Sequence, residues 1–386
     1  MTIGSKELIR DINSHLVLET IIEKAPISRA DLSKTLGLTK ATISSIVQDL
    51  IQNSLVIEIG SGDTSIGRKP TMLTMNEKAG CALCIDLGIQ SVRYMITDLL
   101  GNQILHNVIE FGDGYKNNVV DVLESIIDTC LPHTQFHPYN LIGITIAIHG
   151  VTHDNQIIFT PYYNLPSIDL ATILEQKYHV PVFLYNDSNL AVMGENIFST
   201  KVENIASIYV YSGIGLGMIL NNHLYAGANG YAGELGHTII EINGRQCPCG
   251  NKGCLEQYAS QRALLKELAQ RKGKAKISFE EFASLYRKKD VDAQYIIAQF
   301  VKNMSAGINN LLNLYNPEVI LLNSRFTAEF PELLDQIKAL LLPRMEIADS
   351  IRLSKMNDDA ILYGAAYISI INFLKLKNFR PQIQFD

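Results

Sequence analysis

The order of predicted strands and helices constrains this chain most, because a similar order occurs twice. The first series has three hairpin-joined strands over 83–110, then a helix and a buried strand over 119–148, then a helix and a strand over 170–185. The second series begins with strands over 205–220 and continues with helices around a buried strand at 319–322. Mixed hairpin and βαβ order predicts an α/β fold. Its duplication predicts two lobes with a cleft between them, a place that suits a small ligand.

Composition agrees with a folded chain of 386 residues, since 47% are hydrophobic and only 19% are charged. This length predicts two or three folding units. The first 24 residues carry charges among their apolar positions and do not resemble a secretory signal. The most apolar stretch, 360–374, is shorter than the roughly 20 residues that span a bilayer, so we expect a buried helix there. We therefore expect a cytoplasmic protein with no membrane partner.

Residues 1–75 are predicted to form a winged helix-turn-helix domain. Ser28 followed by Asp31 is typical of a helix start, Gly37 of its end, and Thr39 of the cap of the next helix. Apolar residues recur in that next helix at the spacing of one buried stripe: Ile43, Ile46, Val47, Leu50 and Ile51. A leading helix over about 6–24 is expected to pack on it through Leu8, Ile12, Leu16, Ile21 and Ile22.

The second helix of this pair carries small or hydrogen-bonding side chains on its other face and at its N-terminal turn. These suit contact with base edges and phosphates, and they are Thr39, Lys40, Ala41, Thr42, Ser45 and Gln48. An ordinary helical hairpin is the alternative. Two strand-like segments, 55–59 and 71–75, flank a Gly-rich turn that carries Arg68 and Lys69. These two basic residues favour a wing that enters the DNA minor groove, and a linker between domains is the other interpretation.

The strongest chemical signal is one imidazole and three thiols in a short segment: His237, Cys247, Cys249 and Cys254. This set predicts a tetrahedral zinc site, and four protein ligands leave no position for a metal-bound water. The zinc is therefore expected to be structural. Cys81 and Cys84 also form a CxxC pair, but residues i and i+3 of a strand point to opposite faces, so burial in the core is expected for them.

These residues also carry a family resemblance. Glu234-Leu-Gly-His237, followed by Cys247 to Glu256, resembles the double signature of the ROK family of sugar kinases and transcriptional repressors. With Asn186-Asp187 and the loop 212–217, the resemblance spans about residues 81–375. The predicted winged helix is similar to the repressor branch. Within that branch, segments 57–70 and 159–165 resemble the xylose-responsive repressors of Gram-positive bacteria.

The resemblance implies that a duplicated two-lobe domain of the actin/hexokinase-like (ribonuclease-H-like) fold follows the winged helix-turn-helix, over 76–386. It also implies a sugar in the cleft, contacted by Asn164, Asn186, Asp187, Glu234, His237 and Glu256. In the kinases, the residue matching Asp187 is the general base. A zinc-bound His237 would offer its second ring nitrogen to the sugar.

Departures from the kinase pattern favour a repressor over an enzyme. Where the kinases have an Asp-x-Gly-Gly-Thr phosphate loop, this chain has Asp86-Leu-Gly-Ile-Gln90. Their Gly-rich adenosine loop is replaced by Asn323-Ser-Arg-Phe326, and His149 replaces a Pro that is common before the glycine of a cleft loop. The glycines from Gly213 to Gly217 survive, but they also suit any tight hairpin.

The sequence thus predicts a non-enzymatic, sugar-responsive repressor with xylose as the expected inducer. Its expected partners are operator DNA and a second copy or copies of the chain, in a homodimer or homotetramer. The alternatives are an active ROK sugar kinase with an added DNA-binding domain, and a repressor controlled by a protein partner.

Overall fold

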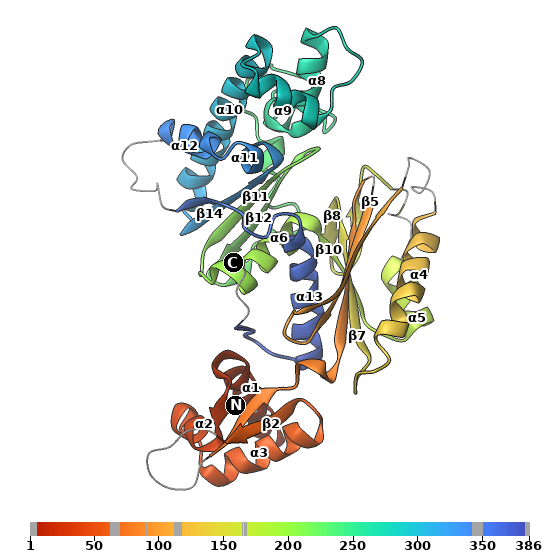
Figure 1. Cartoon of the computed structure of the whole chain (residues 1–386), viewed down its shortest axis with the longest axis vertical. Coiled ribbons are helices and arrows are strands. Elements are labelled where there is room, and N and C mark those ends of the chain that lie inside the picture. Colours follow the sequence, from red (N-terminus) through yellow and green to blue (C-terminus); the bar gives the residue numbers. More distant parts are fainter. Residues whose placement is uncertain are drawn as a thin grey trace. The chain divides into compact units, whose positions relative to one another are not determined.

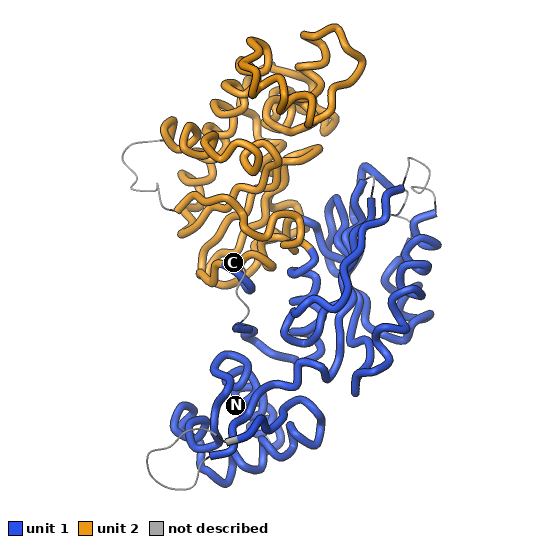
Figure 2. Tube along the Cα trace, in the orientation of Figure 1, with its two compact units in different colours: residues 1–187, 197–199, 362–386 blue, residues 188–196, 200–361 orange. Residues whose placement is uncertain are grey.

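A computed structural model describes residues 6–61, 70–89, 91–111, 118–163, 165, 168–341 and 350–382. The chain forms two compact units, shown in Figure 2. Unit 1 comprises residues 1–187, 197–199 and 362–386, and unit 2 comprises residues 188–196 and 200–361. Within the described residues, no helix is long and apolar enough to cross a membrane.

Unit 1 begins with a winged helix-turn-helix head (Figure 1). Its elements are α1 (Lys6–Lys24), β1 (Ile27–Ser28), α2 (Arg29–Leu36), α3 (Lys40–Gln52), β2 (Val56–Ser61) and β3 (Thr71–Met75). The strands form one antiparallel sheet in the order β1-β3-β2. The head therefore has the predicted helices and the hairpin of a wing.

The predicted helix signals of the head are confirmed. The Ser28 hydroxyl accepts a hydrogen bond from the Asp31 amide, and Gly37 ends α2 with a φ of 67°. The Thr39 hydroxyl accepts from the Thr42 amide at 3.2 Å and so caps α3. Local cap chemistry thus sets both ends of the turn between α2 and α3.

The expected packing of α1 is only partly right. Ile21 and Ile22 are buried, as are Ile43, Ile46, Val47 and Leu50 of α3. Leu8, Ile12 and Leu16, however, are 42–53% exposed. The core of the head instead takes Val17 and Leu18 from α1, because only the C-terminal half of this helix reaches the other elements of the core.

The first α/β sheet also lies in unit 1. Its strand order is β10-β7-β4-β5-β6, built from β4 (Cys81–Leu87), β5 (Ser91–Asp98), β6 (Gln103–Glu110), β7 (Leu141–Ile148) and β10 (Val182–Asn186). Helices α4 (Val119–Cys130) and α5 (Leu170–Tyr178) cover one face, and α13 (Asp359–Leu374) lies on the other (Figure 1). The Ser369 hydroxyl of α13 is 2.8 Å from the Thr145 hydroxyl of β7, so α13 is the buried helix predicted at 360–374. A small hairpin of β8 (Val151–His153) and β9 (Gln156–Phe159) follows β7.

Unit 2 holds the second five-stranded sheet, in the order β13-β12-β11-β14-β15. Its strands are β11 (Ile205–Val210), β12 (Ile214–Leu220), β13 (His223–Leu224), β14 (Val319–Ser324) and β15 (Ile351–Leu353). Its helices are α6 (Asp187–Glu195, of which Asp187 belongs to unit 1), α7 (Glu256–Ala259), α8 (Gln261–Arg271), α9 (Phe279–Arg287), α10 (Val291–Tyr315), α11 (Arg325–Glu329) and α12 (Glu332–Ala339). The two sheets confirm the duplicated α/β fold class. The segment 212–217, expected to be a loop, is strand from Ile214 onward.

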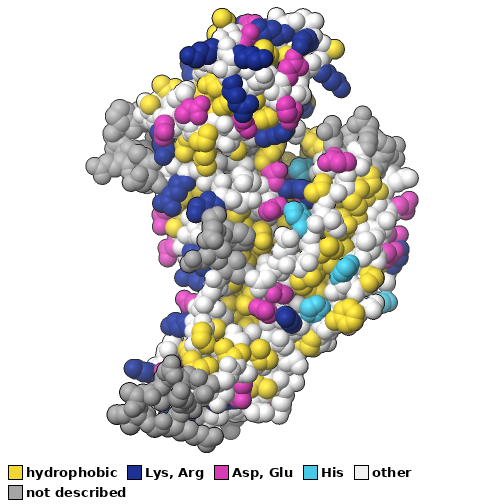
Figure 3. Space-filling view, in the orientation of Figure 1, with side chains coloured by type: hydrophobic (Ala, Val, Ile, Leu, Met, Phe, Trp, Pro, Cys, Tyr) yellow, Lys and Arg dark blue, Asp and Glu magenta, His cyan; other side chains and the backbone are white. Residues whose placement is uncertain are grey.

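Basic and acidic side chains lie close together on the helices of unit 2 that Figure 3 shows at the top. On the face shown in Figure 3, Lys and Arg side chains alternate with Asp and Glu over the helices at the top. Lys272 lies 2.8 Å from Asp290 and 2.7 Å from Asp292. Arg271 pairs with Glu267 in the same way. Arg271 and Lys272 are therefore balanced by neighbouring acids.

Candidate functional site

The predicted metal ligands lie together in unit 2. The ligand atoms of His237, Cys247, Cys249 and Cys254 are all within 4.8 Å of one another. Cys247 Sγ is 3.6 Å from His237 Nδ1, and Cys249 Sγ is 3.6 Å from Cys254 Sγ. The loop is tight because Gly253 has a φ of 86°, and a Cβ there would lie 1.7 Å from the Glu241 carbonyl oxygen.

This ligand set fits zinc. Zn–S bonds of about 2.3 Å and Zn–N bonds of about 2.0–2.1 Å give tetrahedral ligand–ligand distances of roughly 3.5–3.8 Å. The two 3.6 Å separations lie in that range. Three thiols and one imidazole nitrogen complete a four-coordinate set, so no position remains for a reactive water.

The predicted sugar contacts of unit 2 surround this cluster. With Nδ1 of His237 facing Cys247, the ring's Nε2 lies 3.7 Å from a carboxylate oxygen of Glu234. Glu256 is buried, and its Oε1 accepts hydrogen bonds from the Cys247 thiol at 3.4 Å and the Gln257 amide at 2.9 Å. Both carboxylates thus lie beside ligands of the predicted zinc site.

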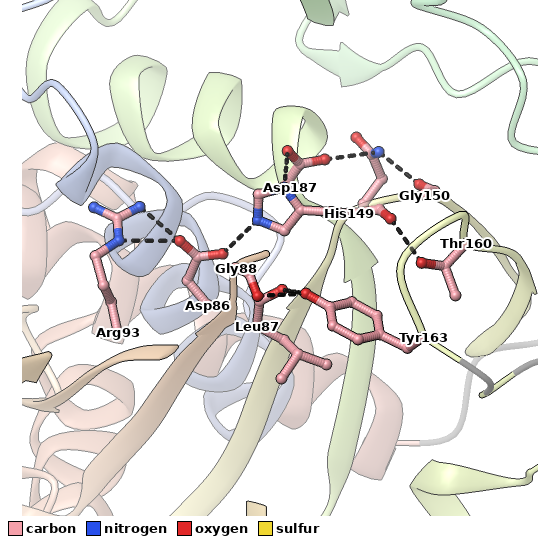
Figure 4. A network of polar contacts seen from close by, with 10 residues as sticks. Asp86, Leu87, Gly88, Arg93, His149, Gly150, Thr160, Tyr163 and Asp187 are labelled. Atoms are coloured by element: carbon pink, nitrogen blue, oxygen red, sulfur yellow. Dashed lines mark hydrogen bonds and ion pairs between the residues drawn. The ribbon is translucent and has the colours of Figure 1, made fainter. Parts of the chain in front are cut away.

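Asp187, one of the predicted sugar contacts of unit 1, is the last member of a chain of four alternating charges. Figure 4 shows the four residues, which are Arg93, Asp86, His149 and Asp187. Arg93 on β5 donates to Asp86 Oδ2 on β4 from Nη2 at 2.6 Å and from Nε at 3.1 Å. His149, just after β7, places Nε2 2.9 Å from Asp86 Oδ1 and Nδ1 3.2 Å from Asp187 Oδ2. Asp187 Oδ1 accepts from the Asn186 side-chain amide at 3.0 Å.

The chain of charges shifts two pKa values. Burial alone would raise the pKa of Asp86, but the charges of Arg93 and His149 outweigh it and lower the pKa to about 2. Burial alone would lower the pKa of His149, yet the carboxylates of Asp187 and Asp86 raise it to about 9. At neutral pH His149 is therefore an imidazolium between two carboxylates.

Side-chain hydrogen bonds to backbone carbonyls hold the loops around the four alternating charges. Asn186 Nδ2 also donates to the Gly150 carbonyl at 2.7 Å, and a Cβ at Gly150 would lie 2.2 Å from the Phe159 carbonyl oxygen. The Thr160 hydroxyl donates to the His149 carbonyl at 3.0 Å. The buried Tyr163 hydroxyl donates to the carbonyls of Leu87 and Gly88, in the segment that replaces the kinase phosphate loop.

The glycines of β12 serve packing in unit 2. A Cβ at Gly215 would lie 2.1 Å from Ser188 Oγ, and one at Gly217 would lie 2.1 Å from the Ser188 carbonyl oxygen. A Cβ at Gly213 would lie 3.2 Å from Glu256 Oε2. The close approach of α6 to β12 explains Gly215 and Gly217, and their presence gives no support to a phosphate site.

The predicted DNA-contacting residues of α3 lie on its outer side. Thr39, Lys40, Ala41, Ser45 and Gln48 are exposed, and Thr42 is half-buried. The apolar stripe of α3 faces the opposite way into the core of the head. Arg68, Lys69, Asn164 and Gln90 lie outside the described residues.

Arg93 was missed by the sequence analysis, although a signal for it exists. Asp86 and Arg93 stand directly opposite each other in the antiparallel β4–β5 pair. Opposite charges facing each other across two strands stabilise a hairpin. The register of the predicted hairpin would therefore have brought these two residues together.

The sequence model of the ROK family matches residues 82–371, which is most of the chain. The chain belongs to the ROK family. A model of the winged helix-turn-helix DNA-binding domain matches residues 10–57. This ROK protein is 36% identical over 383 residues to the xylose repressor of Bacillus subtilis, covering 97% of this chain and 99% of that one.

Solved structures agree with the fold of this ROK chain. A ROK family transcriptional regulator, described as a homologue of the Escherichia coli MLC protein, matches with a TM-score of 0.74 and 26% identity, over 94% of this chain and 99% of that one. A ROK family glucokinase from Streptomyces griseus matches with a TM-score of 0.63 and 22% identity, over 75% of this chain and 99% of that one. The kinase therefore shares the fold over three quarters of this chain. The prediction of a regulator rather than an enzyme agrees with the name of the Bacillus relative.

Proposed function

We propose that this chain represses transcription by binding an operator through residues 1–75, and that xylose binding to residues 76–386 releases it. One observation carries the proposal: the chain aligns along 97% of its length with a protein named xylose repressor, so that head and ROK domain occur together in the same order.

In the proposed DNA complex, α3 enters the major groove of each half-site. Its exposed outer face supplies Thr39, Lys40, Ala41, Ser45 and Gln48, together with the half-buried Thr42. Arg68 and Lys69 contact the adjacent minor groove. Two heads on a palindromic operator require at least a homodimer, because each recognition helix reads one half-site.

In the proposed sugar complex, hydroxyl groups of the pentose donate to the carboxylates of Asp187, Glu234 and Glu256. Asn186, Asn164 and His237 complete the polar contacts. Zinc bound by His237 and the three cysteines fixes the imidazole of His237, and its role is structural.

Release requires that xylose bind more tightly to the conformation with low operator affinity, since equal affinity for both conformations shifts nothing. Binding without phosphorylation is supported by the contacts of Asp86, which begins the segment that stands where the kinases have a phosphate loop. Its carboxylate is buried and is already paired with both Arg93 and His149.

The decisive experiment measures fluorescence anisotropy of the purified chain on its own promoter DNA at fixed salt, with xylose, glucose and N-acetylglucosamine added in turn. We expect xylose to release the DNA and the other two sugars to have little effect. If the chain binds the DNA tightly and none of the three sugars changes this binding, xylose is not the inducer. Absence of DNA binding, together with ADP release in a coupled assay, would support the kinase instead. Asp187→Ala should need much more xylose for release.

A further inference from the structure

Both ring nitrogens of His149 face carboxylate oxygens. Nε2 is 2.9 Å from Asp86 Oδ1, and Nδ1 is 3.2 Å from Asp187 Oδ2. A neutral imidazole has only one N–H, whereas an imidazolium has two. Only the protonated ring can therefore donate to both carboxylates at once (Figure 4).

Asp86, the carboxylate that faces Nε2 of His149, is fixed in position. Asp86 is 3% exposed, and two hydrogen bonds from Arg93 hold its Oδ2. Asp86 thus presents Oδ1 to His149 from a rigid position on β4. A ring anchored at Nε2 in this way sets the position of its Nδ1, and with it the oxygen of Asp187 that Nδ1 faces.

Asp187, the carboxylate that faces Nδ1 of His149, is the proposed sugar contact. Asp187 has one oxygen on His149 and the other on the Asn186 amide at 3.0 Å, so its carboxylate plane is oriented from two directions. A carboxylate oxygen can accept more than one hydrogen bond, so these contacts are compatible with a further one from a sugar hydroxyl. A carboxylate paired with a cation is also a weaker base, which suits binding rather than proton abstraction.

We propose that His149 is a positioning residue of the inducer site, and that its protonated ring holds Asp187 in the orientation that accepts the hydroxyls of the sugar. This inference rests on the proposed function and adds a regulator to the same site, namely the proton on His149.

Alkaline pH should therefore weaken sugar binding. The charged groups that face the ring are Asp86 from β4, Arg93 from β5 and Asp187 at the start of α6. Burial opposes the charge, but the two carboxylates raise the pKa of His149 to about 9. At least one pH unit below that value, the ring is charged and xylose affinity is nearly constant. Above it, a ring nitrogen lone pair faces a carboxylate, and affinity falls by up to about tenfold per pH unit, as expected for one linked proton.

The test is isothermal titration calorimetry of xylose into the full-length, zinc-loaded chain between pH 7 and 10. We expect nearly constant affinity to about pH 8 and a fall of up to roughly tenfold between pH 8 and 10. His149→Gln should bind at least about tenfold more weakly at pH 7, a loss of one charge-assisted contact, and show no alkaline fall. Asp86→Asn should move the fall to lower pH, because one of the two carboxylates that stabilise the imidazolium is gone.

A matched control substitutes the neighbouring His153. Its side chain is 39% exposed and lies 3.4 Å from the exposed Asp154. His153→Gln should keep the wild-type affinity and pH profile. Circular dichroism and operator anisotropy without sugar verify that each variant is folded.

The outcomes separate the two proposals. If wild type binds xylose with constant affinity to pH 10, or if folded His149→Gln matches it, the role of His149 is wrong while the repressor remains. If wild type binds no sugar at any pH, the proposed inducer fails and the role of His149 fails with it. Should His149→Gln not fold, the wild-type and Asp86→Asn profiles decide the question.

Discussion

Gly215 lies so close to Ser188 that a Cβ at residue 215 would stand 2.1 Å from the Ser188 hydroxyl oxygen. Gly215→Ala should therefore force α6 away from β12 and lower the free energy of unfolding by about 1–3 kcal/mol, as overpacked cores do. Urea unfolding followed by circular dichroism measures this loss.

A second substitution tests the cause. Ser188→Ala removes the hydroxyl, and the nearest remaining atom, the Cβ of residue 188, would be 3.3 Å from the new methyl. The double variant should therefore recover much of the stability that Gly215→Ala loses. Additive losses in the two variants would show that this hydroxyl is not the obstacle.

Glu195 should make the stability of the chain depend on pH. It is 1% exposed, its Oε1 accepts from the Ser354 hydroxyl, and its Oε2 has no partner among the described residues. Burial raises its pKa from 4.5 to about 7. Between these two values the unfolded chain loses the proton and the folded chain keeps it, so stability falls as pH rises.

Glu195→Gln keeps the shape of the side chain and removes the charge. From pH 5.5 to pH 8, wild type should lose about 2 kcal/mol relative to this variant in urea unfolding. Parallel pH–stability curves for the two proteins would contradict the raised pKa.

The metal site predicts a change in zinc content. Cys249→Ser should abolish zinc binding and lower the thermal midpoint, because metal binding contributes directly to folding. Cys84→Ala changes a cysteine that is buried in β4 of unit 1, and it should keep one zinc per chain. Mass spectrometry of purified protein measures the metal, and full zinc content in Cys249→Ser would refute the four-ligand site.

The outer face of α3 predicts two different effects on operator binding. Gln48→Ala should cost about 1–3 kcal/mol and relax the preference at one base pair if Gln48 makes the proposed base contact. Lys40→Ala should weaken binding to all sequences and reduce the salt slope by about one. The exposed Lys288 of unit 2 supplies the control, and its removal should change neither quantity. Equal behaviour of the Lys40 and Lys288 variants would place the DNA contact elsewhere.

What the sequence could predict depended on how local each signal is. The caps at Ser28 and Thr39 need only neighbouring residues, and both are where the sequence places them. The metal ligands likewise fall within one short segment. By contrast, the burial of a residue such as Leu8 depends on where other elements end. An apolar stripe within one helix does not predict those ends.

The contacts of His149 with Asp86 and Asp187 lay beyond sequence analysis for a related reason. Asp86, His149 and Asp187 are separated by 63 and 38 residues, and only the register of three strands brings them together. The glycine pattern of β12 was ambiguous because its cause, Ser188, belongs to another element.

Residues 377–382 contact α1 and the residue that follows it. The amides of Lys377 and Asn378 donate to Glu19 of α1 at 2.9 Å, and the Gln382 side chain donates to the carbonyls of Glu23 and Ala25. During synthesis, residues 1–75 leave the ribosome well before residues 377–382, so these contacts form only after the ROK domain has been made. A polypeptide that stops before residue 377 would therefore contain all of α3 and still lack these contacts to α1 and Ala25, so that synthesis of the ROK domain becomes a condition for a fully supported head.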